Sequence, residues 1–519
     1  MVLAVLLICA AAGAVALVRP ISDFYVAGHA VPAPYSGMAI AAWSVAALAY
    51  PALAGGLGPG WRGSLLILAG GVGGLLVIAF LLAPYLRKFG GYTVADFIGE
   101  RFNSTALRQL AVGAVVLCSF PALAAVLVAL AFIVMHFFAI DLSTAIAAAV
   151  AMLFLCTFLG GMRSASRAAV AQYAVVLACS LAALAVLFWQ HGVSSDTLDG
   201  SALFDAFAAL KLGMFAAPDR VNRMALVFCL AAGTAGLPHL VMCAFTARAV
   251  QEARSSFLFA VPFFLVLFVA APAYALLLGG EAVAADDIAS VVLVGLLAAA
   301  SVAALLALGN GLLLAMANAV SYDLYYKSWH LTAPAERRLL VARGAILIVA
   351  ALAALAALSF PRVMFASAGA SFSLAASAFL PVLLIGVWWK RANGEGALAG
   401  MVAGLLVCLY YMVAPHYFPY AFYETSRALS NATEAQAFAY DSLQQRYYIA
   451  DPASRPAVAL LWEINVRAIA NWWGVRRTFA GVFGAPVSAI VMIAVSLFTR
   501  APSEDVRSFV EELRKAQPV

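Results

Sequence analysis

The sequence predicts an all-α polytopic membrane protein with about thirteen transmembrane helices, and three observations support this prediction. The chain of 519 residues is 66% hydrophobic and only 10% charged, and its mean hydropathy is +1.00. Soluble domains carry about 25% charged residues, so a soluble multidomain protein is excluded. The apolar stretches are long enough to cross a bilayer, and no Asp, Glu, Lys or Arg falls inside the apolar core of any of them.

Each expected helix is an apolar stretch bounded by charged or turn-forming residues. The helices are expected at 1–18, 34–56, 64–86, 106–138, 141–161, 168–189, 224–245, 256–279, 288–321, 341–360, 363–388, 396–414 and 478–499. The first stretch has no basic start, and Arg19 and Pro20 follow it instead of a small-residue cleavage site, so we interpret it as a membrane helix. Tilt or a helical extension beyond the bilayer accounts for the two longest stretches.

The basic residues predict the orientation of the chain. One set of loops holds 19 Lys and Arg residues and the other set holds 11. Because the basic loops of membrane proteins stay in the cytoplasm, the sequence predicts an external N-terminus and a cytoplasmic C-terminus. The expected location is the plasma membrane, the inner membrane of a bacterium.

Three segments outside the expected helices are longer than simple turns and differ in composition. Residues 190–223 form a polar external loop, and residues 415–477 form an aromatic-rich segment that is too long for a structureless loop. We expect this second segment to be a packed external cap, with an amphipathic interfacial helix over Ala457–Trp473. The cytoplasmic tail 500–519 is expected to hold a short solvated helix from Ser503, its N-cap, to Lys515.

Six short stretches together resemble the sodium:solute symporter family. They are 23–28 (DFYVAG), 90–102 (GGYTVADFIGERF), 160–162 (GGM) with Gln172, 233–239 (GTAGLPH), 323–325 (DLY) and 381–396. Their order and spacing match the family from residue 23 to about residue 414. The fourth stretch, with Thr246 and 252–254 behind it, is similar to the acetate and monocarboxylate (cation:acetate symporter-like) branch.

The resemblance implies a LeuT-like fold of two inverted five-helix repeats, 34–189 and 224–388, with the solute between broken helices two and seven. The residues independently favour both breaks. Helix seven carries two glycines and Pro238 within six positions, and helix two carries Pro51 with four glycines behind it. A packing kink is the alternative interpretation. Four motif residues are expected in cytoplasmic turns: Gly160, Gly161, Asp96 and Arg101.

The resemblance also implies a sodium ion between helices two and nine, held by backbone carbonyls and two hydroxyls. The matching positions are Ala41, Ser44 and Ala304. The two hydroxyl positions fall on Ala307 and Leu308, which have no side-chain oxygen. Asn310 lies on the same helix face as Ala307 and is the candidate replacement, although an interhelical hydrogen bond, as expected for Asn318, is its alternative role.

The candidate solute pocket combines polar and aromatic residues of helices two, seven and eleven. Its members are Trp43, Ser44, Tyr50, Thr234, Gly236, His239, Ser371, Ser373 and Ser377. A half-helix N-terminus at the helix-seven break would attract a carboxylate, although Cys243 stands where many family members have an arginine. Ordinary helix packing is the alternative role of each residue. For proton coupling, His136 and His239 are the candidate groups near the membrane.

The leading hypothesis is a secondary transporter of a small organic solute, by resemblance a monocarboxylate such as acetate, with Na⁺ as the coupling ion. A proton-coupled or uncoupled carrier on the same scaffold, and a non-transporting membrane sensor or accessory subunit, are the alternatives. An enzyme is not expected, because the sequence shows no nucleophile–base pair, metal cluster or phosphate loop. The expected partners are the lipid bilayer and the solute, without nucleic acid, and a small membrane partner is left open.

Overall fold

The structure is a computed structural model that describes residue 11 and residues 20–48, 61–191, 219–277 and 288–515. In this part of the chain the regular elements are helices, accompanied by two isolated bridges, Val31–Ala247 and Ser430–Trp472. The expected first helix falls almost wholly outside the described residues, as do Tyr50 and the glycines that follow Pro51. The predicted break in helix two therefore stays a prediction.

Helices long and apolar enough to span a membrane dominate the described residues. There are nine of them, or ten if a bent pair of helices is taken as one span: Leu66–Phe89, Thr105–Phe138, Gly161–Val186, Val250–Leu267, Val291–Trp329, Ala335–Ser359, Ala370–Trp388, Gly394–Tyr417, Arg477–Phe498 and the bent pair Arg220–Gly236 with Pro238–Thr246. Two further expected spans correspond to the shorter α3 (Ala33–Leu48) and α9 (Leu142–Thr157). The count of thirteen stays a prediction.

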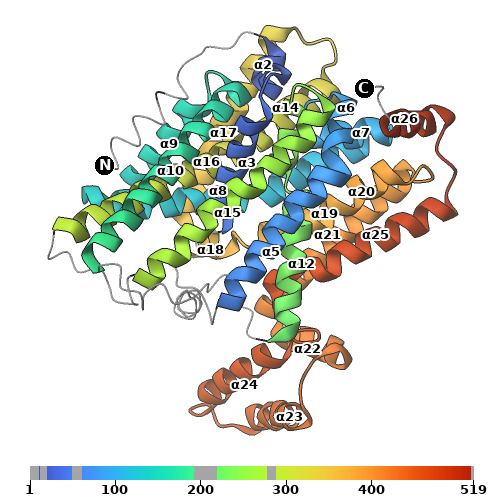
Figure 1. Ribbon diagram of the computed structural model, residues 1–519. Coiled ribbons are helices and arrows are strands. Elements are labelled where there is room, and N and C mark those ends of the chain that lie inside the picture. Colours follow the sequence, from blue (N-terminus) through green and yellow to red (C-terminus); the bar gives the residue numbers. More distant parts are fainter. Residues whose placement is uncertain (1–10, 12–19, 49–60, 192–218, 278–287, 516–519) are drawn as a thin grey trace.

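The described helices fall into two groups in chain order, followed by the helices of the C-terminal part (Figure 1). The first group comprises α2 (Ile21–Val26), η1 (Ala27–His29), α3, α5 (Trp61–Val77), η2 (Ile78–Leu82), α6 (Ala83–Phe89), α7 (Val94–Arg101), α8 (Thr105–Phe138), α9 and α10 (Gly161–His191). The second group comprises α12 (Arg220–Gly236), α13 (Pro238–Val241), α14 (Cys243–Thr246), α15 (Val250–Leu277), α16 (Ile288–Asn318), η4 (Ala319–Trp329), α17 (Ala335–Ser359), α18 (Pro361–Ser367), α19 (Ala370–Ala378) and α20 (Leu380–Trp388).

The helix contacts between the two groups occur in pairs with the roles exchanged. α3 of the first group packs on α15 of the second, and α12 of the second packs on α5 of the first. In the same way α10 packs on α16 while α19 packs on α8. The pattern also repeats within the groups, since α10 packs on α3 in the first group and α19 packs on α12 in the second. The two groups thus use corresponding helices to hold each other.

Small residues allow the helices to approach closely. A Cβ added to Gly233 or Gly236 of α12 would lie 2.5 Å from a carbonyl oxygen of α19. After the second group, α21 (Gly394–Tyr417) packs along α25 (Gly481–Phe498), with three glycines at four-residue spacing against the other helix. These glycines are Gly396, Gly400 and Gly404. Such contacts between small residues are the usual way in which membrane helices associate.

Two helix boundaries differ from the prediction. α10 begins at Gly161, so Arg163 and Arg167 lie in its first two turns instead of a loop. Gly161 has φ +54°, and a Cβ there would lie 2.4 Å from the Phe24 carbonyl oxygen, so this position requires glycine. The expected helix eleven is divided into α18, α19 and α20, with Pro381 in the first turn of α20.

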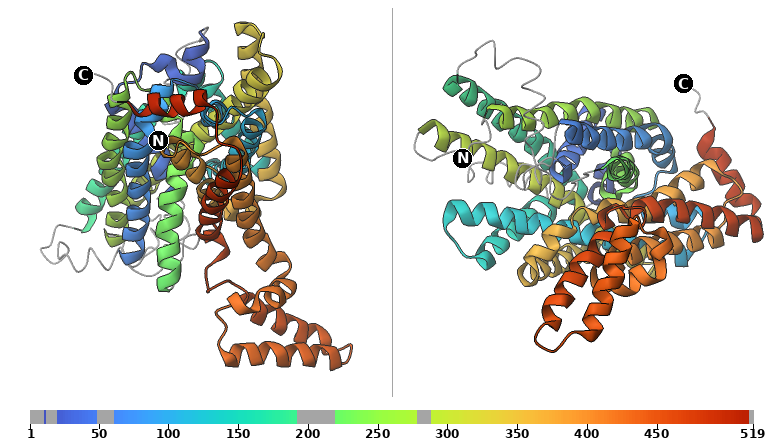
Figure 2. Two further views of the ribbon diagram at one scale, coloured as in Figure 1. Left: turned by 90° about the vertical axis from the view of Figure 1, so that its right-hand side faces the viewer. Right: turned by 90° about the horizontal axis from the view of Figure 1, so that it is seen from below.

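The expected cap is helical and packed around aromatic rings. It consists of α22 (Pro419–Ser426), η5 (Arg427–Leu429), α23 (Glu434–Ile449), α24 (Arg455–Ile469) and η6 (Arg477–Phe479). The Trp462 ring on α24 lies 4.2 Å from the Tyr420 ring and 5.7 Å from the Tyr440 ring. The α23–α24 hairpin projects from one end of the helix bundle, roughly across the direction of the spans (Figure 2). We call this end of the molecule the α24 end.

The C-terminal helix α26 (Glu504–Arg514) lies at the opposite end, which we call the α26 end (Figure 1). The predicted solvated tail is wrong, because Val510 and Leu513 are buried and Phe509 packs edge-to-face on Phe89 of α6. Lys390 pairs with Glu511 and fixes the helix further. Ser503 precedes the helix, but its side chain makes no capping hydrogen bond, contrary to the prediction.

Candidate functional site

Helix seven is interrupted, as the sequence predicts. α12 and the two short helices that follow it form one apolar span bent by 48°. Leu237 between them has φ −64° and ψ 118°, the extended conformation that a following proline favours. The interruption therefore lies at Leu237, next to the expected segment Gly233–Gly236, which is helical and packs against α19.

The interrupted helix meets α3 and α16 at a group of buried polar side chains, which we call the central polar cluster. Its members are Trp43, His239 and Asn318. The rings of Trp43 and His239 lie with their centroids 6.4 Å apart and their planes tilted by 59°. A Cβ at Gly311 would lie 3.1 Å from the Trp43 ring, so the indole packs on α16 beside Asn310.

The central polar cluster has unused hydrogen-bonding capacity. Among the described residues, neither ring nitrogen of His239 nor the indole nitrogen of Trp43 has a hydrogen-bond partner, although both side chains are buried. The Asn318 Nδ2 group donates to the Met242 sulfur at 3.7 Å, while its Oδ1 atom has no partner in the same part of the chain. Buried polar groups are almost always hydrogen-bonded to protein, water or a ligand, so these atoms have the capacity to bind one of the latter two.

The serines of the predicted pocket do not join this cluster as a set. The Ser373 hydroxyl donates to the Thr478 carbonyl oxygen at 2.7 Å, and the Ser377 hydroxyl donates to the Ser373 carbonyl oxygen at 2.8 Å. Gly481 and Gly484 of α25 pack directly on these two serines. The two hydroxyls are therefore used by a bond to η6 and a bond within α19, and α25 covers both serines.

The remaining pocket candidates lie on other contacts of the same helices. Thr234 packs against Gly74 of α5, and its buried hydroxyl has no hydrogen-bond partner among the described residues. Gly236 lies against the Ala375 carbonyl oxygen, where a larger residue would not fit. The Ser371 hydroxyl is buried without a partner in the described part of the chain, so among the predicted serines it alone has a free hydroxyl.

The predicted sodium positions lie on two helices that pack together, α3 and α16. Ala41 and Ala304 are buried there, and the Ser44 hydroxyl donates to the Ile40 carbonyl oxygen at 2.8 Å. Ala307 and Leu308 are buried as well, so the two hydroxyl positions present only alkyl groups. The buried Asn310 amide contacts the Cys156 thiol of α9.

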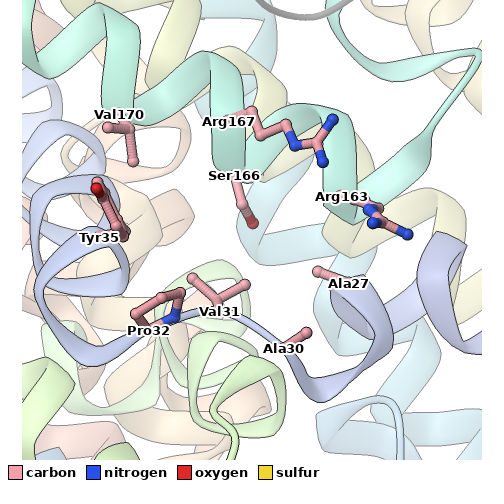
Figure 3. Close-up of a pocket in the computed structure, with 9 residues that line it drawn as sticks. All are labelled: Ala27, Ala30, Val31, Pro32, Tyr35, Arg163, Ser166, Arg167 and Val170. Atoms are coloured by element: carbon pink, nitrogen blue, oxygen red, sulfur yellow. The ribbon is translucent and has the colours of Figure 1, made fainter. Parts of the chain in front are cut away.

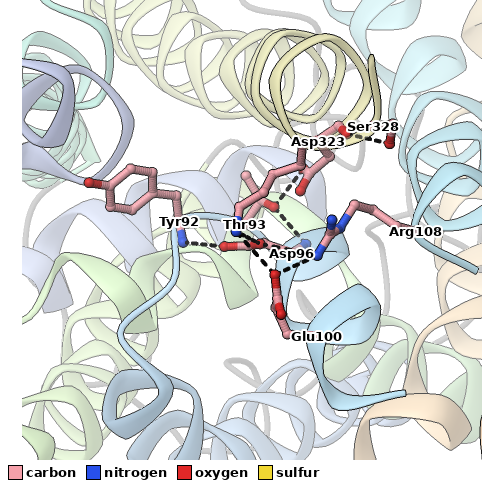
Figure 4. Close-up of polar contacts among 8 residues, drawn as sticks. Tyr92, Thr93, Asp96, Glu100, Arg108, Asp323 and Ser328 are labelled. Carbon is pink, nitrogen blue, oxygen red and sulfur yellow. Dashed lines mark hydrogen bonds and ion pairs between the residues drawn. The ribbon is translucent and has the colours of Figure 1, made fainter. Parts of the chain in front are cut away.

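A charged network closes the α26 end beside η4 (Figure 4). The Thr93 hydroxyl donates to Asp323 Oδ2 at 2.6 Å and accepts the Asp96 amide at 2.9 Å, so Thr93 both caps α7 and holds η4. Glu100 accepts from Arg108 at 2.8 Å and from Lys327 at 3.0 Å. Burial raises the pKa of Asp96 in spite of the nearby charges of Lys327 and Arg108.

The structure shows the contacts of the two charged motif residues, Asp96 and Arg101. Asp96 lies in the first turn of α7, as expected for an acidic residue at a helix N-terminus. Arg101 is fully buried and donates to the carbonyl oxygens of Gly386, Trp389 and Ala392 at the end of α20. Burial lowers the pKa of its guanidinium to about 10. The sequence did not identify Arg108 and Lys327, which share Glu100.

The broken helix is tied to the N-terminal segment at the same end. His29 Nδ1 lies 2.6 Å from the Phe245 carbonyl oxygen, and the Arg248 side chain donates to the Ala30 carbonyl oxygen at 3.1 Å. The Arg87 guanidinium donates to the Ala247 carbonyl oxygen at 2.6 Å. These bonds hold α14, η1 and α6 together, so they fix the second half of helix seven, after the break, at the α26 end.

A cavity of about 370 Å³ lies beside this tie, between the start of α3 and the start of α10 (Figure 3). Its lining is Ala27, Ala30, Val31, Pro32, Tyr35, Arg163, Ser166, Arg167 and Val170. Arg163 also pairs with Asp23 of α2, whereas Arg167 makes no ion pair with any described residue. None of the predicted pocket residues lines this cavity.

Comparisons with known proteins agree with this arrangement. The chain is 27% identical to an uncharacterized symporter of Cupriavidus necator, and the match covers 98% of this chain and 92% of the relative. The structure of the present chain is similar to that of a Na⁺-coupled sialic acid symporter in a substrate-bound outward-open state. The TM-score is 0.71, the sequence identity is 14%, and the match covers 96% of this chain and 97% of the other.

The structural likeness confirms that the chain shares the all-helical fold of that symporter, and the apolar spans make it a multi-pass integral membrane protein. The two inverted repeats stay a prediction. The profile of the sodium:solute symporter family matches residues 24–404, most of the chain and all of the helices that form the central polar cluster. Members of this family are transporters, not enzymes. The chain belongs to the sodium:solute symporter family.

Proposed function

We propose that this protein imports a small monocarboxylate, such as acetate, across the bacterial inner membrane by sodium symport. The observation that carries the proposal is the central polar cluster, where unpaired buried polar atoms meet the break in helix seven. Broken helices of transporters place their substrate and ion sites at such interruptions. Membership of the sodium:solute symporter family supports transport over a sensor or accessory role.

The chemistry of the cluster favours an anionic solute. The Trp43 indole is a hydrogen-bond donor only, and a neutral His239 ring carries one further N–H donor. A carboxylate has two acceptor oxygens and would satisfy both groups, with the methyl group of acetate against the apolar walls.

The ion site would lie between α3 and α16. Backbone oxygens near Ala41, Ser44 and Ala304, with the Asn310 amide oxygen in place of a hydroxyl, would supply the oxygen ligands that a hard cation prefers. A proton-coupled or uncoupled carrier is the second candidate. It is favoured by the alkyl side chains of Ala307 and Leu308 at the two positions where the family has hydroxyls.

Alternating access would use the exchanged contacts between the two helix groups. If residues 34–189 and 224–388 are inverted repeats, rocking of one bundle would open the α24 end and the α26 end in turn. The described structure is tied at the α26 end by His29, Arg87 and Arg248. We propose that this end is cytoplasmic, as the distribution of basic residues predicts.

The substrate class is tested by uptake into proteoliposomes under a fixed inward sodium gradient. Labelled acetate, propionate, pyruvate and lactate would be compared with acetamide and glycerol, which lack the charge, and with glycine, which is zwitterionic. Saturable uptake confined to monocarboxylates supports the proposal. Uptake of a neutral or zwitterionic solute with no uptake of any carboxylate refutes the substrate class while leaving the transporter fold intact.

A further inference from the structure

Helix α24 carries apolar side chains on two opposite faces. One face packs inside the cap, where Trp462, Val466 and Ile469 are buried. The other face is open: Leu460, Leu461 and Ile464 are 58%, 55% and 58% exposed. Their spacing of three and four residues places them on one side of the helix. We call this side the open face of α24.

A contact with the helix bundle fixes the direction of the open face. Arg467 lies one turn after Ile464 on the same side of α24, and its Nη1 atom lies 3.2 Å from His416 Nδ1. His416 belongs to the last turn of α21, a membrane span. Figure 1 shows α24 between α23 and the bundle. The open face is therefore turned toward the level at which the spans end.

The open face continues the lipid-facing surface of α21. That helix exposes apolar side chains at three- and four-residue spacing along its length: Val402, Leu406, Tyr410, Val413 and Tyr417. The stripe ends in the exposed aromatic residues Tyr417 and Phe418, as is typical of a span at the membrane–water interface. Because α24 runs roughly across the spans beside this point, its open face extends over the bilayer next to the bundle (Figure 2).

We propose that the open face of α24 lies in the interfacial layer of the lipid bilayer, with Leu460, Leu461 and Ile464 at the boundary between headgroups and acyl chains. Amphipathic helices bind membranes in this orientation. Arg467 stands at the C-terminal end of the face, where a long basic side chain reaches lipid phosphates. The bilayer thus holds the cap against the bundle, independently of the solute that the transporter carries.

Single labelling sites on the two sides of the hairpin test this proposal. In a functional background without the seven native cysteines, Leu460→Cys and Ile464→Cys would each be labelled with bimane and reconstituted in liposomes that contain brominated phosphatidylcholine. Phe438→Cys is the matched control, because Phe438 is 75% exposed and lies on the side of α23 opposite the buried Tyr440. We expect the lipid bromine to quench residues 460 and 464 at least twofold more than residue 438.

The opposite results are informative as well. Equal quenching at all three sites, or iodide quenching of residues 460 and 464 as strong as that of residue 438, overturns the proposal and indicates full immersion or a water-exposed or protein-covered face. If the labelled variants do not fold, photolabelling of the wild-type protein in liposomes with a lipid-soluble diazirine gives the same answer. Label must then concentrate in the peptide that contains α24 and not in the peptide that contains α23, and the reverse distribution also overturns the proposal.

Discussion

The indole of Trp43 and the imidazole of His239 lie next to each other beside the break in helix seven, with ring centroids 6.4 Å apart and planes tilted by 59°. Trp43 belongs to α3, in the first helix group, and His239 belongs to α13, in the second. The two rings thus connect the halves of the protein, and their nitrogens have no hydrogen-bond partner among the described residues. A bound carboxylate would bridge them.

Removal of the Trp43 donor should weaken solute binding specifically. We expect Trp43→Phe, which keeps an aromatic ring in place, to raise the KM for carboxylate uptake about 10-fold or more, since a hydrogen bond to a charged group contributes about 1.5–3 kcal/mol. Trp473→Phe in the exposed part of the cap is the control and should leave the KM unchanged. An unchanged KM in a correctly folded Trp43→Phe protein would remove the indole from the site.

Replacement of His239 distinguishes a solute-binding role from a proton-carrying role. His239 is fully buried, and no described carboxylate lies in an ion pair with it. We therefore expect His239→Gln to lower uptake several-fold and to leave the pH profile of the remaining uptake unchanged, measured between pH 5.5 and 8.5. Loss of the pH dependence in the variant would instead assign a proton route to His239.

The close contact of α12 with α19 depends on glycine. In Gly236→Ala the new methyl group would lie 2.5 Å from the Ala375 carbonyl oxygen, so the helices must separate. We expect a loss of about 1–3 kcal/mol in stability and a strong loss of uptake. Gly344→Ala on α17 is the matched control, because nothing lies within 4 Å of its Cβ position. Equal melting temperatures of the two variants in detergent would contradict the packing described here.

Two of the carboxylates in the α26-end network, Asp96 and Glu100, should affect stability in opposite directions at neutral pH. Burial raises the pKa of Asp96, so its contribution is most favourable at low pH and is lost as the pH rises through the folded-state pKa. Burial also acts to raise the pKa of Glu100, but the hydrogen bonds and charges of Lys327 and Arg108 outweigh it and lower that pKa. The contribution of Glu100 is therefore present above its unfolded-state pKa and is lost as the pH falls.

Thermal unfolding between pH 4.5 and 8 measures these opposite signs. Compared with the wild type, Asp96→Asn should have an equal or slightly higher melting temperature at pH 7, and this difference should be smaller or reversed at pH 5. The reason is that the variant leaves two carboxylates, Glu100 and Asp323, with two cations. Glu100→Gln should lose several degrees at pH 7 and less at pH 4.5. Parallel curves for the two variants would mean that the network does not distinguish its two acids in this way.

The fold and the break in helix seven could be predicted because both depend on the local amino-acid composition. Apolar length defines the spans, and Pro238 fixes its preceding residue, Leu237, in an extended conformation. The same rule would have placed the break one residue later than the glycines suggested. Gly233 and Gly236 instead allow the close contact with α19. Residue spacing along one helix does not reveal such a tertiary contact.

The candidate site was less predictable, since the use of a hydroxyl depends on which helix packs beside it. Ser373 and Ser377 share a helix face with a plausible pocket, but α25 covers them. The docking of the C-terminal helix, in contrast, could have been predicted from its apolar residues. Phe509, Val510 and Leu513 follow a helical spacing, and this apolar stripe docks on the bundle.

The most direct measurement of the central claim is uptake of labelled acetate into proteoliposomes with and without an inward sodium gradient, at constant pH and membrane potential. We expect accumulation above equilibrium only when the sodium gradient is present, and its collapse when a sodium ionophore is added. Accumulation that is unchanged without sodium and that follows an imposed proton gradient would contradict sodium coupling, and the absence of carboxylate flux under either gradient would contradict the proposed transport itself.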